Sequence, residues 1–303
     1  MRPNFEIEFG SDQITRNFRM SHNAGEAACK YCVAGEVMDG TPQGTMSELG
    51  GIEYYLGGQA TSGGAEATGA AEGATKAIVF CHDIFGMSVN NPKLIADALT
   101  KATSLPVYVP DYLQGDYVDP SKLPLVESPV AHKPLVERVM ILAKTLFSFM
   151  YHTGPTFIYR HRAAVTVPIV EKVSIRFFLC SLVSTEIVSI QFCTALRGQG
   201  ITRIGAVGYC LGGDVTTKLS INDKFVNAAV VAHPGPLGLK DFTNITIPYS
   251  LIFASEDPMM DSKKEEVIRV LEGKKDCEHR EYAGTVHGFA ARPVKADPVV
   301  QRA

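Results

Sequence analysis

RIGAVGYCLGG, residues 203–213, is a short apolar run that leads into a glycine-rich turn and then a helical pattern. The run has the length expected of a fully buried strand. A strand, a Gly-x-Cys-x-Gly-Gly turn and a helix together form the context of a nucleophile elbow, where a sharp turn presents one reactive side chain. We expect that positions 208 and 212 have no room for a side chain, because strand and helix must approach closely there. The stretch predicts an α/β fold with Cys210 at the turn.

The residues on either side of this stretch extend the same alternation of strands and helices. Residues 76–82 and 106–111 are strand-like and enclose a predicted helix with Asn91 as its N-cap and Pro92 in its first turn. The apolar positions of that helix share one face, at Leu94, Ile95, Ala98 and Leu99. A short strand is predicted at 52–56, fully buried strands at 203–209, 228–232 and 249–254, and a last helix at 263–271. We therefore predict an α/β fold with a mostly parallel sheet and helices on both faces.

The domain organisation follows from composition along the chain. We divide it into an N-terminal arm, residues 1–50, and one α/β domain, residues 51–303. Residues 57–75 are rich in Gly, Ala and Ser and poor in large apolar groups, which predicts a flexible loop. Residues 173–191 are apolar and interrupt a helical pattern, but Arg176 and Glu186 break them too early for a membrane span. Because Val-Ser can be encoded by GTGAGT and Gln by CAG, we hypothesise a retained intron, which transcript sequencing tests.

Composition and charge exclude several functions. The 303 residues are 46% hydrophobic and 20% charged, which suits a folded chain rather than a disordered one. A net charge of −3 provides no basic field for nucleic acid or an anionic membrane. The N-terminus has acidic residues where a signal peptide would be apolar, so we expect a cytoplasmic protein. The CxxC at Cys29 and Cys32 is interpreted as an ordinary loop, because with His22 it reaches only three zinc ligands.

Two more residues complete a candidate catalytic set with Cys210. Asp257 follows the strand at 249–254, and His287 follows a strand-like stretch near residues 280–282. Loops after the carboxyl ends of parallel strands meet at one edge of the sheet, so these three side chains are expected to converge. A helix N-terminus favours the thiolate of Cys210, and the amide of Leu211 points to where an oxyanion would form.

Each of these residues also has an ordinary structural interpretation. Cys210 could be a small buried residue, Asp257 an exposed turn residue with Asp261 as a rival acid, and His287 a surface histidine. The order of the three on successive strand ends favours the catalytic interpretation. His233, at the end of another strand, is interpreted as lining a pocket or hydrogen-bonded rather than as a base.

The side chains of His82 and Asp83, which precede the predicted helix at 91, can be oriented in two ways. His82 and Asp83 are consecutive on an extended chain, so their side chains point to opposite faces and only one can face the site. Cys81 is expected to belong to the core.

Five separated blocks resemble, in order, the dienelactone hydrolase family of α/β hydrolases: CHDIFGM, VPDYLQGD, GYCLGGD, SEDP and VHGFAARP. The resemblance covers about residue 50 to the end apart from the insertion, and the N-terminal residues resemble the eukaryotic branch. It implies a triad of Cys210, Asp257 and His287. It also implies two oxyanion donors, the amides of Ile84 and Leu211, and two substrate contacts, Asp83 and Arg292. Bacterial members carry glutamate at the position of Asp83, and their arginine lies one residue nearer the histidine than Arg292.

The expected activity is therefore hydrolysis of an ester or lactone through a cysteine nucleophile, of the carboxymethylenebutenolidase type. We expect a small-molecule substrate, no cofactor, no metal, and no nucleic-acid or membrane partner. A non-catalytic binding protein of the same fold is the alternative, suggested by a chain that stops sixteen residues after His287 and by the apolar insertion. A thiol redox protein would need a resolving cysteine close to Cys210 in the sequence, and there is none.

Overall fold

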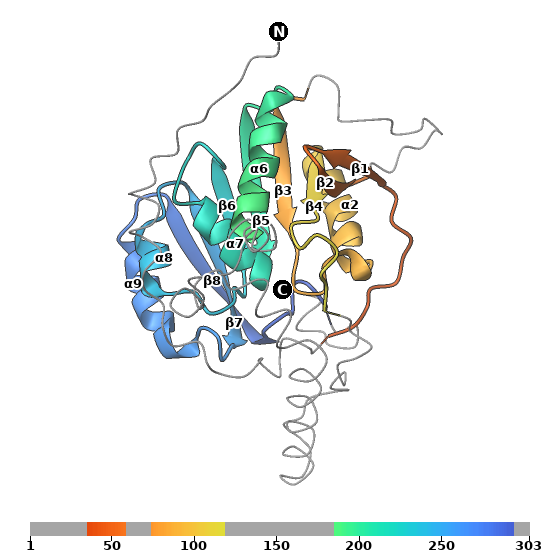
Figure 1. The fold of residues 1–303 in the computed structure, drawn as a ribbon. Coiled ribbons are helices and arrows are strands. Elements are labelled where there is room, and N and C mark those ends of the chain that lie inside the picture. The colour runs from red at the N-terminus through yellow and green to blue at the C-terminus, as the bar shows by residue number, and fades with distance from the viewer. Residues whose placement is uncertain (1–34, 59–73, 119–184, 294–303) are drawn as a thin grey trace, which may run out of the picture.

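A single sheet runs through the protein (Figure 1). The structure, a computed structural model, describes residues 35–58, 74–118 and 185–293, and within them the sheet has eight strands in the order β1-β2-β4-β3-β5-β6-β7-β8. β1 and β2 pair with each other, and β2 with β4, in antiparallel fashion, whereas all the other pairs are parallel. The strands are β1 (Thr45–Leu49), β2 (Ile52–Leu56), β3 (Lys76–Cys81), β4 (Val107–Pro110), β5 (Arg203–Tyr209), β6 (Ala228–Ala232), β7 (Tyr249–Glu256) and β8 (Cys277–Val286). The predicted mostly parallel sheet is confirmed.

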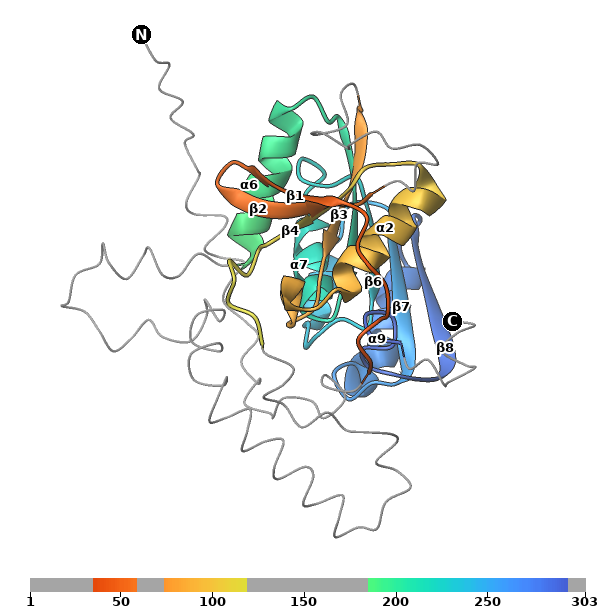
Figure 2. The same cartoon turned by 90° about the vertical axis from the view of Figure 1, so that its right-hand side faces the viewer.

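Helices cover both faces of this sheet, as predicted (Figure 2). One face carries α6 (Thr185–Gly198), α7 (Leu211–Leu219), α8 (Leu239–Thr243) and α9 (Lys264–Glu272). The other face carries α2 (Asn91–Thr103). Short 3-10 turns lie at η1 (Gly86–Ser88) and η4 (Asp261–Lys263).

Apolar side chains of β3 point alternately to the two faces of the sheet, so helices must pack on both faces to bury them. Ile78 and Phe80 pack with residues of α2, while Val79 and Cys81 pack on the opposite face with residues of α6 and α7. Full burial of one such large apolar side chain stabilises the fold by about 1.5–3 kcal/mol. Cys81 is 0% exposed, which confirms its place in the core, and burial raises the pKa of its thiol to about 12.

The sheet begins earlier than the predicted domain boundary at residue 51. β1 lies in the segment that we assigned to an arm, yet it pairs in register with β2 across Gly50 and Gly51. Both glycines have positive φ, 62° and 80°, as a tight hairpin turn requires. The CxxC lies outside the described residues, as do residues 59–73 of the predicted flexible loop.

Helix α2 begins one residue earlier than predicted. Asn90 occupies the N-cap position and makes no capping hydrogen bond through its side chain, while Asn91 is already helical. The side chain of Asn91 bonds to backbone groups outside the helix instead. The predicted apolar face is also displaced, because Ala98 is exposed and the buried positions include Ala96 and Thr100.

Strand β6 is not buried on both faces, contrary to prediction. Its residues alternate between exposed and buried, and Val230 is 37% exposed. The reason is that, among the described helices, only α2 lies on this face, and it packs near β3 and β4 rather than β6.

The second part of the suspected insertion is helical. Residues 185–191 form the first half of α6 and continue without a break into residues 192–198. Val188 and Phe192, one from each half, are both buried in the core. Residues 173–184 lie outside the described part of the chain, so the intron hypothesis stays a prediction for transcript sequencing. No helix in the described ranges is long and apolar enough to cross a membrane.

Candidate active site

Cys210 occupies a sharp turn between β5 and α7, as the opening stretch predicts. Its backbone has φ 53° and ψ −119°, a conformation that a residue with a side chain adopts only under strain. Surrounding hydrogen bonds hold it there: Cys210 N donates to Ala232 O at 3.3 Å, and Cys210 O accepts from Gly213 N at 2.9 Å. The thiol is thereby fixed at the N-terminus of a helix.

The two glycines of the turn leave no room for a side chain, which confirms the expectation from sequence. A Cβ on Gly208 would lie 2.2 Å from Gly212 O and 2.3 Å from Thr216 Oγ1. A Cβ on Gly212 would lie 2.0 Å from Cys81 O and 2.4 Å from His82 O. The start of α7 therefore packs directly on the backbone at the end of β3, which brings Leu211 and the residues after β3 together.

Replacing Gly212 by alanine is expected to destabilise the fold by about 3 kcal/mol, because the new methyl group would meet backbone atoms that cannot rotate away. The measurement is the free energy of unfolding in urea. Gly198→Ala is the matched control, since a Cβ on Gly198 meets nothing within 4 Å. Equal stabilities of the two variants would show that the elbow has more room than the structure gives it.

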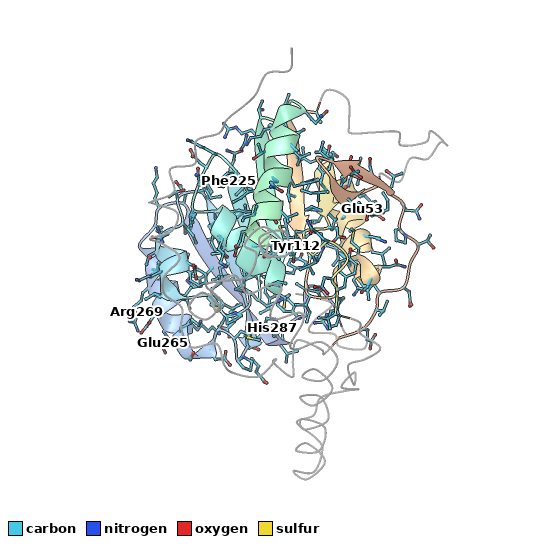
Figure 3. The ribbon with its side chains drawn as sticks, in the orientation of Figure 1. Glu53, Tyr112, Phe225, Glu265, Arg269 and His287 are labelled. Carbon is cyan, nitrogen blue, oxygen red and sulfur yellow. The ribbon has the colours of Figure 1, made fainter. Side chains whose placement is uncertain are left out.

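Asp257 and His287 meet at the carboxyl ends of β7 and β8. Figure 3 shows where His287 lies. His287 Nδ1 lies 3.0 Å from Asp257 Oδ1 and 2.9 Å from Asp257 Oδ2, with both side chains buried. Asp257 Oδ1 also accepts a hydrogen bond from Met259 N at 3.1 Å, which fixes the carboxylate. Asp261, the rival acid, is exposed and accepts from Asp257 N at 3.1 Å, so it supports the turn while Asp257 pairs with the histidine.

The Cys210 sulfur and the His287 ring interact electrostatically. Burial lowers the pKa of His287, but its interactions with the nearby Cys210 sulfur and with the Asp257 carboxylate outweigh burial and raise the pKa well above its ordinary value. Nδ1 is engaged by Asp257, and Nε2, the other ring nitrogen, is buried and has no hydrogen-bond partner among the described residues. The structure thus places Asp257 in hydrogen-bond contact with His287, and Cys210 near enough to His287 to raise the pKa of its ring.

The amides of Ile84 and Leu211 are available beside this group. Among the described residues, neither N–H donates a hydrogen bond to a protein acceptor. The turn around Ile84 is closed by its neighbours, because Asp83 Oδ1 accepts a hydrogen bond from Phe85 N at 3.0 Å. Two free amides of this kind can stabilise a developing oxyanion.

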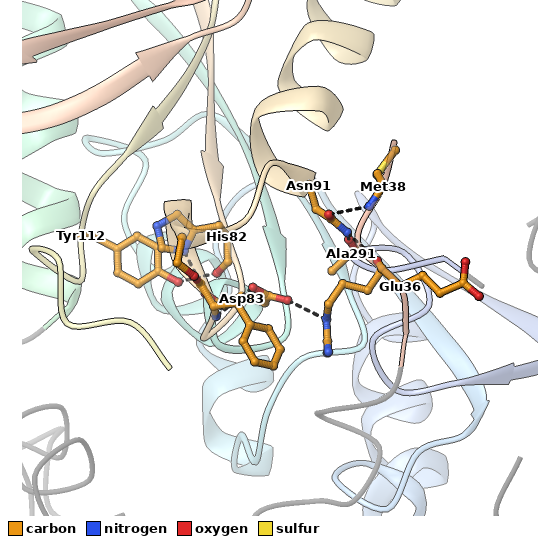
Figure 4. Close-up of polar contacts among 10 residues, drawn as sticks. Glu36, Met38, His82, Asp83, Asn91, Tyr112 and Ala291 are labelled. Carbon is orange, nitrogen blue, oxygen red and sulfur yellow. Dashed lines mark hydrogen bonds and ion pairs between the residues drawn. The ribbon is translucent and has the colours of Figure 1, made fainter. Parts of the chain in front are cut away.

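Asp83 and Arg292, the two predicted substrate contacts, are paired with each other (Figure 4). Arg292 Nε donates to Asp83 Oδ2 at 3.0 Å, and the two side chains are only 6% and 5% exposed. The Arg292 guanidinium also lies over the ring of Phe85, 4.4 Å from its centroid. A buried ion pair with this additional support is held firmly in place, whereas a single remaining partner would be costly to keep buried.

Two further histidines lie near the site. The ring of His82 stacks on Tyr112 with centroids 4.5 Å apart, and its Nδ1 lies 2.8 Å from the backbone oxygen of Asp83. The ring of His233 lies 5.0 Å from that of His287 and is fully buried. Burial, and then repulsion from His287, lower the pKa of His233 well below its ordinary value, so it stays neutral. Within the described part of the chain its ring nitrogens have no hydrogen-bond partner, so it lies beside the base without hydrogen-bonding to it.

Asn91 is the residue near the site that sequence reasoning missed. Two asparagines precede Pro92, and only one of them can occupy the N-cap of α2. A second asparagine beside the N-cap indicates that the side chain of one of the two bonds to groups outside the helix. In the same described ranges, no group of three or more His, Cys, Asp or Glu side chains is arranged to hold a metal ion.

A mostly parallel sheet that carries an elbow cysteine, an acid and a histidine at the carboxyl ends of its strands defines an α/β-hydrolase fold. The chain belongs to the dienelactone hydrolase family, whose family model matches residues 64–302.

Individual relatives agree with this assignment. The hydrolase pyvD of Aspergillus violaceofuscus is 26% identical over 267 residues, covering 86% of this chain and 84% of its own. A Saccharolobus solfataricus protein named as a carboxymethylenebutenolidase is 29% identical over 95 residues, 31% of this chain and 37% of its own. The crystal structure of a Klebsiella pneumoniae protein named as a dienelactone hydrolase superposes with a TM-score of 0.50 at 15% identity, over 86% of this chain and 92% of that one. This last likeness supports the fold.

Proposed function

We propose that this protein hydrolyses a carboxylic ester or lactone through a covalent intermediate on Cys210. The observation that carries the proposal is the setting of one buried histidine, which is bonded to an acid and lies near a thiol. His287 is hydrogen-bonded to Asp257 through Nδ1, and the nearby Cys210 sulfur raises the pKa of its ring. This is the relation that a nucleophile, a base and an orienting acid need.

The reaction has two halves. In the first, the Cys210 thiolate attacks the carbonyl carbon, and the amides of Ile84 and Leu211 stabilise the negative oxygen of the tetrahedral intermediate. Collapse breaks the ester C–O bond, and protonated His287 gives its proton to the leaving alkoxide, which leaves a thioester. In the second half, neutral His287 takes a proton from water, the hydroxide attacks the thioester, and collapse releases the acid and restores the thiolate. Asp257 holds the imidazole and stabilises its cation in both halves.

Asp83 and Arg292 are proposed to contact the substrate. Asp83 directly precedes Ile84, and its partner Arg292 has the kind of guanidinium that binds carboxylates through paired hydrogen bonds. We expect a substrate that carries a carboxylate beside its ester to approach the guanidinium of Arg292 while Arg292 Nε stays hydrogen-bonded to Asp83. Esters and lactones that also carry a carboxylate are therefore the substrate class that we propose.

The test is a panel of lactones and short-chain nitrophenyl esters, with and without a carboxylate, combined with iodoacetamide labelling. We expect turnover of at least one class and inactivation in proportion to alkylation of Cys210, because among the cysteines that the structure describes this one raises the pKa of a neighbouring histidine. Unfolding in urea is expected to abolish the selectivity of labelling. No turnover of any substrate, together with equal labelling of all accessible thiols, would instead support a non-catalytic binding protein.

A further inference from the structure

Asn91 ties two segments that are far apart in the sequence to the first turn of α2 (Figure 4). Its Oδ1 accepts a hydrogen bond from Met38 N at 2.9 Å, and its Nδ2 donates to Glu36 O and to Ala291 O, each at 3.0 Å. The residue is 2% exposed. A buried amide with both of its donors and its acceptor engaged is held in a single orientation. Asn91 therefore links the N-terminal segment to the loop that follows His287.

The N-terminal segment at residues 35–38, here called the strap, also touches Arg292 directly. Gly35 has φ 117°, a conformation that favours glycine, and a Cβ there would lie 2.4 Å from Arg292 O and 2.6 Å from Arg292 Cβ. The close approach of the two backbones is thus built into the chain. Arg292 is held from two sides, by the strap and through its neighbour Ala291 by Asn91.

Arg292 transmits this restraint to the turn that carries an oxyanion donor. Its Nε donates to Asp83 Oδ2 at 3.0 Å, and the other carboxylate oxygen accepts from Phe85 N at 3.0 Å. Ile84 lies between these two residues, so the direction of its N–H is set by the turn that Asp83 closes. A continuous set of contacts leads from the strap to the amide of Ile84.

We propose that Asn91 is a positioning residue of the active site, and that through it the strap holds Arg292, Asp83 and the Ile84 amide in the geometry needed to stabilise an oxyanion. The inference rests on the proposed function, in which Ile84 supplies one of two oxyanion donors. Reaction rates are sensitive to such positioning, since a misplacement of about 1 Å caused by a distant substitution can cost about 100-fold.

The test uses Asn91→Ala in the full chain, with activity expressed per active site. Active sites are counted by the stoichiometry of Cys210 alkylation, so that loss of folded protein does not count as loss of catalysis. We expect kcat per site to fall by about 10- to 100-fold. A trifluoromethyl ketone, which adds to the thiolate to form a tetrahedral oxyanion, is expected to bind more weakly by a similar factor. Asn90→Ala, at the exposed neighbouring asparagine, is the matched control and should leave both values unchanged.

Asn91→Ser provides a second measurement in case the alanine variant does not fold. Serine keeps one hydroxyl for hydrogen bonding, so its loss of kcat per site is expected to be smaller than that of Asn91→Ala. Values of kcat per site and of inhibitor affinity within about twofold of wild type in the folded variants would overturn the inference, because twofold is far below the cost of a misplaced oxyanion donor. Failure of the proposed function gives a different pattern, in which wild type itself shows no turnover linked to Cys210.

Discussion

Cys210→Ala is expected to reduce kcat/KM for the best ester of the panel by up to about six orders of magnitude, as removal of a nucleophile does in serine triads. Alanine has no group that can attack the carbonyl, so only substrate binding and the oxyanion donors remain. The elbow itself should survive, because alanine adopts the strained backbone of position 210 no less readily than cysteine. Circular dichroism and thermal unfolding would check that the variant is folded.

Cys277→Ala is the control for the loss of a thiol as such. Cys277 is partly buried at the start of β8, away from the carboxyl ends of the strands where Cys210 lies. Its replacement should leave kcat/KM unchanged. A Cys210→Ala protein that keeps more than about 1% of wild-type activity would refute the nucleophile, since triad variants lose far more.

Asp257→Asn is expected to lower kcat/KM by about 10³- to 10⁴-fold, because an amide cannot stabilise the histidine cation and favours the wrong tautomer of the ring. The pH dependence gives a second, signed result. In the wild type, burial lowers the pKa of His287, but the Cys210 sulfur and Asp257 raise it further than burial lowers it. Removing the carboxylate takes away part of what raises this pKa. The alkaline limb of the pH–rate profile, where His287 loses its proton, therefore moves to lower pH.

The same shift affects stability. Because the pKa of His287 is raised in the folded protein, its protonation stabilises the fold fully below the unfolded value of about 6.5 and less as pH rises through the raised pKa. The difference in free energy of unfolding between wild type and Asp257→Asn should therefore narrow as pH rises above about 6.5. Asp261→Asn is the matched control, since an amide oxygen can still accept from Asp257 N. An alkaline limb that stays in place or moves upward in Asp257→Asn would contradict the assigned pairing.

The pattern of apolar and turn residues within short stretches of sequence is sufficient to predict most of the strands and the elbow. The strands at 203–209 and 228–232 were predicted with the bounds that the structure has, because each is a short apolar run that ends in a turn. The elbow was predictable for the same reason, since Gly208, Cys210 and Gly212 lie within five consecutive residues. The convergence of Asp257 and His287 followed from topology, because parallel strands all end at one edge.

Contacts across long sequence separations could not be read from local pattern. Nothing near Asp83 indicates that its carboxylate pairs with Arg292, 209 residues away. Asn91 was interpreted as an N-cap because Asn before Pro is typical of a helix start, yet its side chain reaches Ala291, 200 residues away. The exposure of Val230 also depends on where α2 packs, which the sequence of β6 does not encode.

The 209-residue separation of Asp83 and Arg292 has a consequence during synthesis. At about 5–20 residues per second, a ribosome adds the arginine roughly 10–40 s after the aspartate, so the aspartate waits without its counter-ion while the middle of the polypeptide is made. Cys210, the proposed nucleophile, is likewise translated before His287, its proposed base. We therefore expect ribosomes that stall before codon 287 to release inert products rather than weak enzymes, which ties the onset of chemistry to completion of translation.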